Sequence, residues 1–309
     1  MPETIYNDQF RLDTTLASGG FATVYRATDM LSGRVVAVKV GRLHEDPGYA
    51  KAIIEEAKIL GRMSHRGVVQ LINLPRPGKA PVAFARALDM PGRPYFFVME
   101  YLGGGTLDEY LKQVKQLSLT EAAAIATEVA RGLRHVHKRG YAHNDLKLEN
   151  IVFRQPLVFG QPFTPVLIDF GIATRVKMQV EAGSLYIMAP EQLIQANMTK
   201  PPELYAEPDP TKVDVWGLGV LLYRMLGGRL PFEARSERSL TDRIITSRPT
   251  SLGRLANIAP EVDELILEGC LAKNPAQRLD MLQVGTYLSR LAHGATVQTL
   301  PGGWFGRQV

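Results

Sequence analysis

The chain has 309 residues, 45% of them hydrophobic, and a formal net charge of +5 at pH 7. This length is enough to bury a full-sized core in two unequal lobes, and the single cysteine, Cys270, excludes an intrachain disulfide and a cysteine-based zinc cluster. No signal peptide is visible, and the longest apolar stretch, 213–226, is shorter than the roughly 20 residues of a membrane span. We therefore expect a cytoplasmic protein that binds no membrane and, because no long basic run concentrates its charge, no nucleic acid.

The first hundred residues predict a small unit rich in β-strands. Between Phe10 and Val40, runs of Val, Thr, Tyr and Phe are broken by glycine at 18–20 and 31–33, which favours three antiparallel strands. A helix should follow, since apolar residues then recur at helical spacing. These residues are Ile53, Ile54, Ala57, Leu60 and Met63. Strands resume near 68–74 and 95–99, and the Pro- and Gly-rich stretch 75–94 predicts an extended hairpin or flap.

After three glycines at 103–105 the pattern becomes mostly helical, which places a lobe boundary at 102–105. Ser118 and Glu121 form a capping-box pattern that begins a helix running to about Lys138. The stretch 213–226 is apolar nearly all round, as expected for a helix through the centre of a domain. Two further helices are predicted near 261–272 and 280–292.

The most informative segment reads His143-Asn-Asp145-Leu-Lys147-Leu-Glu-Asn150, followed by Asp169-Phe-Gly171. It combines a carboxylate that can take a hydroxyl proton, a lysine near the moving charge, and oxygen ligands for magnesium, which are the parts that phosphoryl transfer needs. In these motifs the chain resembles the eukaryotic-type (Hanks-type) serine/threonine protein kinase domain, in the variant that lacks arginine before the catalytic aspartate.

The resemblance implies an α+β, bilobal protein-kinase fold, with a small β-rich N-lobe containing one major helix and a larger, mainly helical C-lobe. We expect an N-terminal leader at 1–9, the N-lobe at 10–102, the C-lobe at 103–292 and a C-terminal tail at 293–309. No regulatory module is expected, so control would come from a regulatory partner protein or from expression.

The resemblance also implies an ATP site in the N-lobe, beginning with a phosphate-covering loop. Only Gly19 of this loop matches the family's three glycines, because Ala17 and Ala22 replace the outer two. The loop residues implied are Leu16, Ala17, Ser18, Gly19, Gly20, Phe21, Ala22 and Val24. Lys39 matches the lysine that binds the inner phosphates, and helix position favours Glu56 over Glu55 as its partner. The adenine pocket would take Ala37, Met99, Glu100 and Leu102.

In the catalytic half, the resemblance assigns Asp145 as the base or hydroxyl-orienting group and Lys147 as a contact to the transferred phosphoryl group. Asn150 and Asp169 would hold Mg²⁺. Ala189-Pro-Glu191 matches a motif whose glutamate pairs with Arg278, and this set favours a protein substrate with a Ser or Thr acceptor. Asp214 matches the aspartate that braces the catalytic loop. We expect His143 to pack and hydrogen-bond within that loop.

Asn144 stands where regulated kinases carry an arginine that faces a phosphate on the activation loop. Between Gly171 and Ala189 the only Ser or Thr residues are Thr174 and Ser184. We therefore hypothesise an enzyme that is active without phosphorylation of this loop.

Two insertions stand out against the family pattern. The first, 154–165, predicts a surface hairpin, and the second, 199–210, is either a tolerated loop or an acidic contact for a basic substrate or partner. Two other functions remain open: a nucleotide-binding pseudokinase scaffold, which the altered glycine loop and Asn144 favour, and a kinase-like enzyme acting on a small metabolite.

Overall fold

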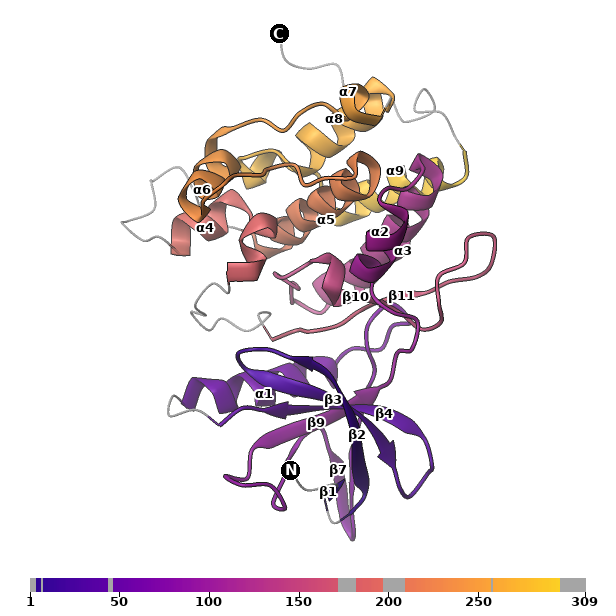
Figure 1. The fold of residues 1–309 in the computed structure, drawn as a ribbon, viewed down its shortest axis with the longest axis vertical. Coiled ribbons are helices and arrows are strands. Elements are labelled where there is room, and N and C mark those ends of the chain that lie inside the picture. The colour runs from indigo at the N-terminus through magenta and orange to yellow at the C-terminus, as the bar shows by residue number, and fades with distance from the viewer. Residues whose placement is uncertain are drawn as a thin grey trace.

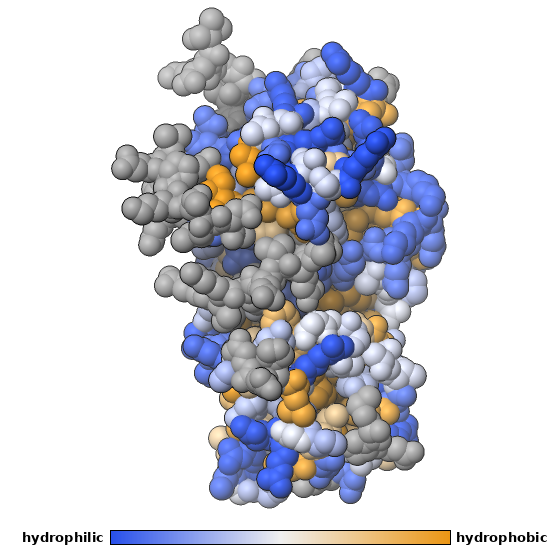
Figure 2. Space-filling view, turned by 60° about the vertical axis from the view of Figure 1, so that its left-hand side comes forward, coloured by the Kyte–Doolittle hydropathy of each residue, from blue (hydrophilic) through white to orange (hydrophobic). Residues whose placement is uncertain are grey.

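The computed structural model describes residues 4–6, 8–43, 47–171, 182–196, 209–256 and 258–294. Two lobes lie one above the other, and the chain passes between them after β9 (Figure 1). On the face in Figure 2, hydrophilic side chains cover much of the described surface and apolar ones show between them in smaller areas. No helix within the described ranges is long and apolar enough to cross a membrane.

The small lobe is built on an antiparallel sheet of strand order β1-β2-β3-β4-β9-β5, with β8 also paired to β9. The strands are β1 (Thr4–Ile5), β2 (Phe10–Ser18), β3 (Ala22–Asp29), β4 (Val35–Gly41), β5 (Leu71–Ile72), β8 (Ala85–Arg86) and β9 (Tyr95–Glu100). The three strands predicted between Phe10 and Val40 are thus confirmed. Ile5, which we assigned to the leader, is fully buried in β1 and extends the sheet.

The one long helix of this lobe, α1 (Pro47–Leu60), packs on β4 and β9. Its buried stripe includes Ile53, Ala57 and Leu60 as predicted, whereas Ile54 is only half-buried and Met63 lies beyond the end of the helix. The flap predicted at 75–94 contains a hairpin of β6 (Leu74–Arg76) and β7 (Lys79–Val82).

The large lobe is mainly helical (Figure 1). Its helices are α2 (Leu107–Val114), α3 (Leu119–Lys138), α4 (Pro190–Ala196), α5 (Pro210–Gly227), α6 (Glu237–Thr246), α7 (Leu252–Ala256), α8 (Pro260–Glu264) and α9 (Met281–Ala292). Short 3-10 turns occur at Leu148–Asn150, Ala182–Ile187 and Pro275–Gln277, and α8 continues into a π-helix at Leu265–Cys270. A two-stranded sheet of β10 (Ile151–Phe153) and β11 (Pro165–Leu167) closes the surface hairpin predicted at 154–165.

The predicted helix starts and stops are confirmed where they rest on capping chemistry. The Ser118 side chain accepts a hydrogen bond from the Glu121 backbone, and the Glu121 side chain accepts one from Ser118. The C-terminus of another helix, α5 at the centre of the lobe, is followed by Gly228. This residue has φ +70°, a left-handed conformation that glycine adopts at little cost.

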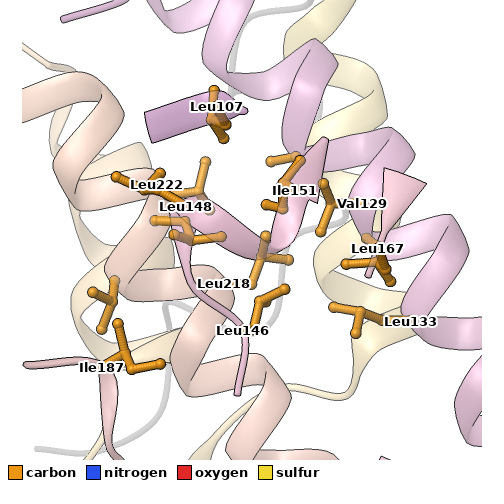
Figure 3. Packing of buried hydrophobic residues seen from close by; sticks show 14 of the residues in the cluster. Leu107, Val129, Leu133, Leu146, Leu148, Ile151, Leu167, Ile187, Leu218 and Leu222 are labelled. Atoms are coloured by element: carbon orange, nitrogen blue, oxygen red, sulfur yellow. The ribbon is translucent and has the colours of Figure 1, made fainter. Parts of the chain in front are cut away.

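Helix α5 runs through the core of the large lobe, and the loop between α3 and β10 rests on it. Figure 3 shows Leu146 and Leu148 from this loop packed with Leu218 and Leu222 of α5. Gly217 permits this approach, because a Cβ there would meet the Cβ of Leu146 at 3.0 Å. The loop that carries the candidate catalytic residues is therefore anchored by apolar side chains on a buried helix.

Candidate active site

The candidate catalytic loop is held by Asp214 near the start of α5. This carboxylate is fully buried, and its two oxygens accept hydrogen bonds from the backbone N–H of His143, at 2.9 Å, and of Asn144, at 2.8 Å. The His137 Nε2 lies 2.7 Å from the same carboxylate. The predicted bracing by Asp214 is confirmed, and His137 is a third partner that the sequence did not indicate.

His143 is fully buried within this loop, as predicted. Its Nε2 donates to the carbonyl of Ile168 at 2.9 Å, and its ring lies 4.8 Å from that of Phe170. Asn144 has φ +63°, in the left-handed region that asparagine tolerates better than most residues. The loop conformation is thus fixed by its neighbours on both sides of Asp145.

Three of the predicted site residues meet at one carboxylate. The Oδ2 of Asp145 lies 2.9 Å from Lys147 Nζ and accepts a hydrogen bond from Asn150 Nδ2 at 3.1 Å. The same Nδ2 donates to the Asp145 carbonyl at 2.9 Å, which leaves the Asn150 side-chain oxygen as the group that can bind a cation. Burial acts to lower the pKa of Lys147, but Asp145 outweighs it and raises the pKa, so the ammonium keeps its charge.

A second cluster joins the two lobes around Lys39 of β4. Its Nζ lies 2.8 Å from both carboxylate oxygens of Glu56 and 2.9 Å from Oδ1 of Asp169. Glu56 also accepts from the backbone N–H of Phe170 at 3.2 Å. Glu55 instead pairs with Lys58 on the outer face of α1, so the prediction that Glu56 is the partner of Lys39 is confirmed.

The Lys39 ammonium offsets the two carboxylates beside it, but burial outweighs its effect on Glu56 and, together with Asp169, raises the pKa of Glu56. Burial acts to lower the pKa of Lys39, but Asp169 and Glu56 together raise it above its ordinary value. Burial acts to raise the pKa of Asp169, yet the Lys39 ammonium outweighs it and lowers this pKa to about 2. Asp169 is therefore ionised across the physiological range, with Oδ1 on Lys39 and its other oxygen available to a cation.

The predicted phosphate-covering loop is the turn of the β2–β3 hairpin. Leu16, Ala17 and Ser18 end β2, Ala22 begins β3, and the N–H of Gly19 donates to the Ala22 carbonyl at 3.0 Å. Val24 of β3 pairs with Lys39 of β4, which brings the hairpin to the lysine. The side chains at its tip are tied to the lobe: Arg42 donates to Ser18 Oγ at 2.7 Å, and the rings of Phe21 and Tyr49 lie 4.6 Å apart.

The predicted adenine pocket lies where β4 faces β9 and the chain leaves for the large lobe. Ala37 and Met99 are paired across these strands, and both side chains are buried. The N–H of Glu100 already donates to the carbonyl of Gln70 at 2.9 Å, so Glu100 can offer a ligand only its carbonyl. Leu102, half-buried on the linker, follows two residues later.

The side chain of Glu100 makes an interlobe contact that we did not predict. Arg154, which directly follows β10 of the large lobe, forms an ion pair with it, and the Gln70 N–H donates to its Oε1 at 2.9 Å. Arg154 Nη2 also donates to the Arg66 carbonyl at 3.0 Å. We call this contact the hinge clasp (Glu100, Arg154, Gln70 and Arg66).

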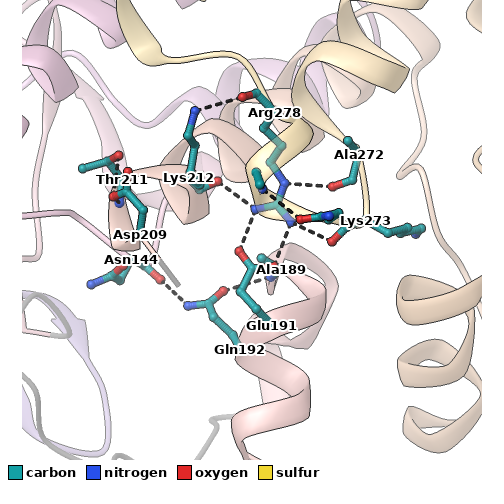
Figure 4. A network of polar contacts seen from close by, with 12 residues as sticks. Asn144, Ala189, Glu191, Gln192, Asp209, Thr211, Lys212, Ala272, Lys273 and Arg278 are labelled. Carbon is teal, nitrogen blue, oxygen red and sulfur yellow. Dashed lines mark hydrogen bonds and ion pairs between the residues drawn. The ribbon is translucent and has the colours of Figure 1, made fainter. Parts of the chain in front are cut away.

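The segment after Ala189 is fastened to the lobe by a buried ion pair (Figure 4). Arg278 contacts Glu191 through two parallel bonds of 2.6 and 2.7 Å, as predicted, and also donates to the carbonyls of Ala272 and Lys212. Beside this pair, Gln192 accepts from the Ala189 N–H and donates to the carbonyl of Asn144 at 3.2 Å. Gln192, which no motif marked, thereby connects this segment to the catalytic loop.

Some predictions fall outside the described residues. They concern Thr174, the side chain of Ser184 and most of the acidic insertion, 199–208. Of the described residues between Gly171 and Ala189, Tyr186 donates a hydrogen bond to the Glu149 carboxylate at 3.2 Å.

Comparison with known proteins places this geometry in context. Residues 10–287 match the family model described as "Protein kinase domain". The chain is 27% identical, over 90% of its length, to serine/threonine-protein kinase PLK4 of Aedes aegypti, and 28% identical, over 94%, to serine/threonine-protein kinase PknL of Mycobacterium tuberculosis. It is 29% identical, over 93%, to the probable serine/threonine-protein kinase PknB of Corynebacterium glutamicum. The matches cover 32%, 68% and 43% of these relatives, so the chain spans about a third of the length of PLK4.

Proposed function

Because the chain belongs to the protein kinase domain family, we propose that it transfers the γ-phosphate of ATP to a Ser or Thr hydroxyl of a protein substrate. The observation that carries this proposal is the joint assembly of two clusters, Lys39 with Glu56 and Asp169, and Asp145 with Lys147 and Asn150. Each cluster supplies one half of a phosphoryl transfer site.

In the proposed reaction Asp145 orients the acceptor hydroxyl and takes its proton as the oxygen attacks the γ-phosphorus. The bond from this phosphorus to the oxygen that bridges it to the β-phosphate breaks, and ADP leaves. Two ammonium groups, Lys147 and Lys39, balance the negative charge of the phosphates. Both are in the right protonation state for this role, because the neighbouring carboxylates raise their pKa. The phosphate-covering loop then excludes water from the transfer.

The residues present also fit Mg²⁺. Asp169 and Asn150 each have a free side-chain oxygen, and hard cations prefer oxygen ligands. Within the described ranges no group of three or more His, Cys, Asp or Glu side chains could hold a metal ion. Two protein oxygens are nevertheless enough for Mg²⁺, which is usually bound by one or two side chains together with water and substrate phosphates. Bound there, the ion would neutralise phosphate charge.

A protein substrate is favoured by the segment after Ala189. The buried Glu191–Arg278 pair and the bond from Gln192 to the catalytic loop give this segment a fixed position beside Asp145. Such a platform suits a polypeptide better than a small metabolite. The names of the relatives, all serine/threonine-protein kinases, support a Ser or Thr acceptor.

The test uses the purified chain, labelled ATP, Mg²⁺ and a generic basic protein acceptor. Asp145→Asn should lower turnover by at least about 10²-fold, the scale of lost acid–base assistance, with an unchanged circular dichroism spectrum. Asp242→Asn, the same substitution at an exposed position on α6, is the control and should retain full activity. Nucleotide binding with no transfer by the unsubstituted chain would favour the pseudokinase scaffold instead.

We further propose that the enzyme is active without phosphorylation of its activation loop. The support is Asn144: it carries no charge that needs a phosphate, and Asp214 and Gln192 already hold its backbone. Phosphatase treatment should leave the turnover unchanged, and Thr174→Ala and Ser184→Ala should each retain activity. Activity that disappeared on dephosphorylation and returned on rephosphorylation at either position would refute this proposal.

A further inference from the structure

A basic cavity of about 510 Å³ lies between α3 and α9, which pack side by side in the large lobe (Figure 1). Arg131 and Arg134 line it from α3, and Arg290 and His293 line it from α9. None of these residues belongs to the two clusters of the active site. Among the described residues that line it, every ionisable side chain is basic.

Glu128 of α3 offsets part of the positive charge of the lining. Arg131 forms an ion pair with Glu128, but the same carboxylate also lies 3.8 Å from Arg66, so one anion serves two guanidinium groups. An anionic ligand would therefore find an attractive potential here.

The shape of the cavity is set by the close approach of the two helices. Gly285 of α9 lies over Ala130 of α3, where even a Cβ would come within 3.4 Å of the alanine methyl group. Hydroxyl groups of Thr286 and Ser289 add neutral hydrogen-bonding capacity to the lining. The His293 Nδ1 donates to the Ser289 carbonyl at 2.6 Å, which leaves its Nε2 for a ligand.

We propose that this cavity binds a small ligand bearing more than one phosphate group, at a site separate from the ATP site. Guanidinium groups suit this chemistry because their planar forks bind phosphate oxygens through paired, charge-assisted hydrogen bonds. The volume exceeds that of a single phosphate ion and falls in the range of about 300–1,000 Å³ that small-molecule sites occupy. Two of the three arginines belong to α3 and the third belongs to α9, so both helices contribute guanidinium groups to the lining.

The test is isothermal titration calorimetry of the full chain with inorganic pyrophosphate, without magnesium. We expect saturable binding that weakens at least about tenfold in Arg134→Gln/Arg290→Gln, because two charged forks are lost. The matched control, Arg238→Gln/Arg254→Gln, removes the same charge from exposed positions on α6 and α7 and should bind like the unsubstituted chain. Equal weakening in both double variants would mean attraction by net charge alone and would overturn the proposal.

Two more variants complete the experiment. Arg134→Lys/Arg290→Lys keeps the charge but loses the planar guanidinium groups that bind phosphate through paired hydrogen bonds. We expect it to bind pyrophosphate several-fold more weakly than the unsubstituted chain. This measurement remains informative even if the glutamine variant does not fold. Lys39→Met removes the central cation of the active site and should leave pyrophosphate binding unchanged. Loss of binding in Lys39→Met, or no binding by the unsubstituted chain, would contradict a separate site.

Discussion

At the scale of single residues, two adjacent glutamates show how position decides role. Glu56 is buried against Lys39 and the Phe170 N–H, whereas Glu55 pairs with Lys58 on the half-exposed face of α1. The two side chains are chemically identical and start from neighbouring backbone positions. Their different partners follow from the helical rotation of about 100° per residue, which turns only one of them towards β4.

We predict that Glu56→Gln lowers kcat/KM for ATP by about tenfold or more, equivalent to roughly 1.4 kcal/mol of transition-state stabilisation. Glutamine keeps the shape of the side chain but removes the charge that helps to hold Lys39, leaving Asp169 as its only anionic contact in the cluster. Steady-state kinetics measure the effect. Glu55→Gln is the matched control and should stay close to the unsubstituted enzyme; a similar loss in both variants would show that general charge, not this pairing, matters.

The residues that the sequence could not predict share a physical reason. Motif spacing marked Lys39, Asp145 and Asp169, because their roles recur at fixed distances along the chain. Arg154 and Gln192 act through single contacts with segments far away in the sequence, so no local pattern identifies them. A polar or charged residue next to a strand or at the start of a helix is interpreted as a surface residue until its tertiary partner is known.

At the scale of elements, α5 and its surroundings explain the stability of the large lobe. The helix was predicted because its apolar character and its terminal glycines are properties of the sequence itself. The short helices α4, α6 and α7 were not predicted individually, because at 5 to 10 residues they show little periodicity and depend on packing. The same holds for the π-helix that continues α8, which a regular 3.6-residue pattern does not reveal.

The buried Glu191–Arg278 pair predicts a large stability effect. Arg278→Ala should lower the free energy of unfolding by about 3–5 kcal/mol, because Glu191 would remain buried without its countercharge. Urea unfolding monitored by fluorescence measures this change. Arg248→Ala, which breaks the exposed pair with Glu268, is the comparison and should cost no more than about 1 kcal/mol. Similar losses in the two variants would mean that the buried pair is not a main support of the lobe.

At the scale of the whole molecule, the hinge clasp is a charged contact between the two lobes. Glu100 is the last residue of β9 in the small lobe, and Arg154 is the first residue after β10 in the large lobe. Their ion pair spans the same junction at which the adenine-binding backbone is expected. We therefore expect this contact to couple the position of the large lobe to the shape of the proposed nucleotide pocket.

We predict that Arg154→Ala raises KM for ATP about three- to tenfold while kcat changes little, because ground-state positioning of the hinge is loosened and the catalytic groups are untouched. Initial-rate kinetics over a range of ATP concentrations separate the two constants. Arg66→Ala serves as a control. It keeps the backbone carbonyl through which Arg66 takes part in the hinge clasp, and it removes only a side chain that donates to Thr164 at 2.9 Å. An unchanged KM in Arg154→Ala would exclude a role for the clasp in nucleotide binding.

The hydrogen bonds from the backbone N–H groups of His143 and Asn144 to Asp214 have a consequence for hydrogen exchange. Loop amides usually exchange quickly with solvent, yet these two donate to a fully buried carboxylate near the start of α5. They can exchange only when that helix separates from the loop, so their protection should match that of the core helices. We therefore expect the segment that carries Asp145 to open together with the core helices of the large lobe, and hydrogen exchange measured by mass spectrometry tests this expectation.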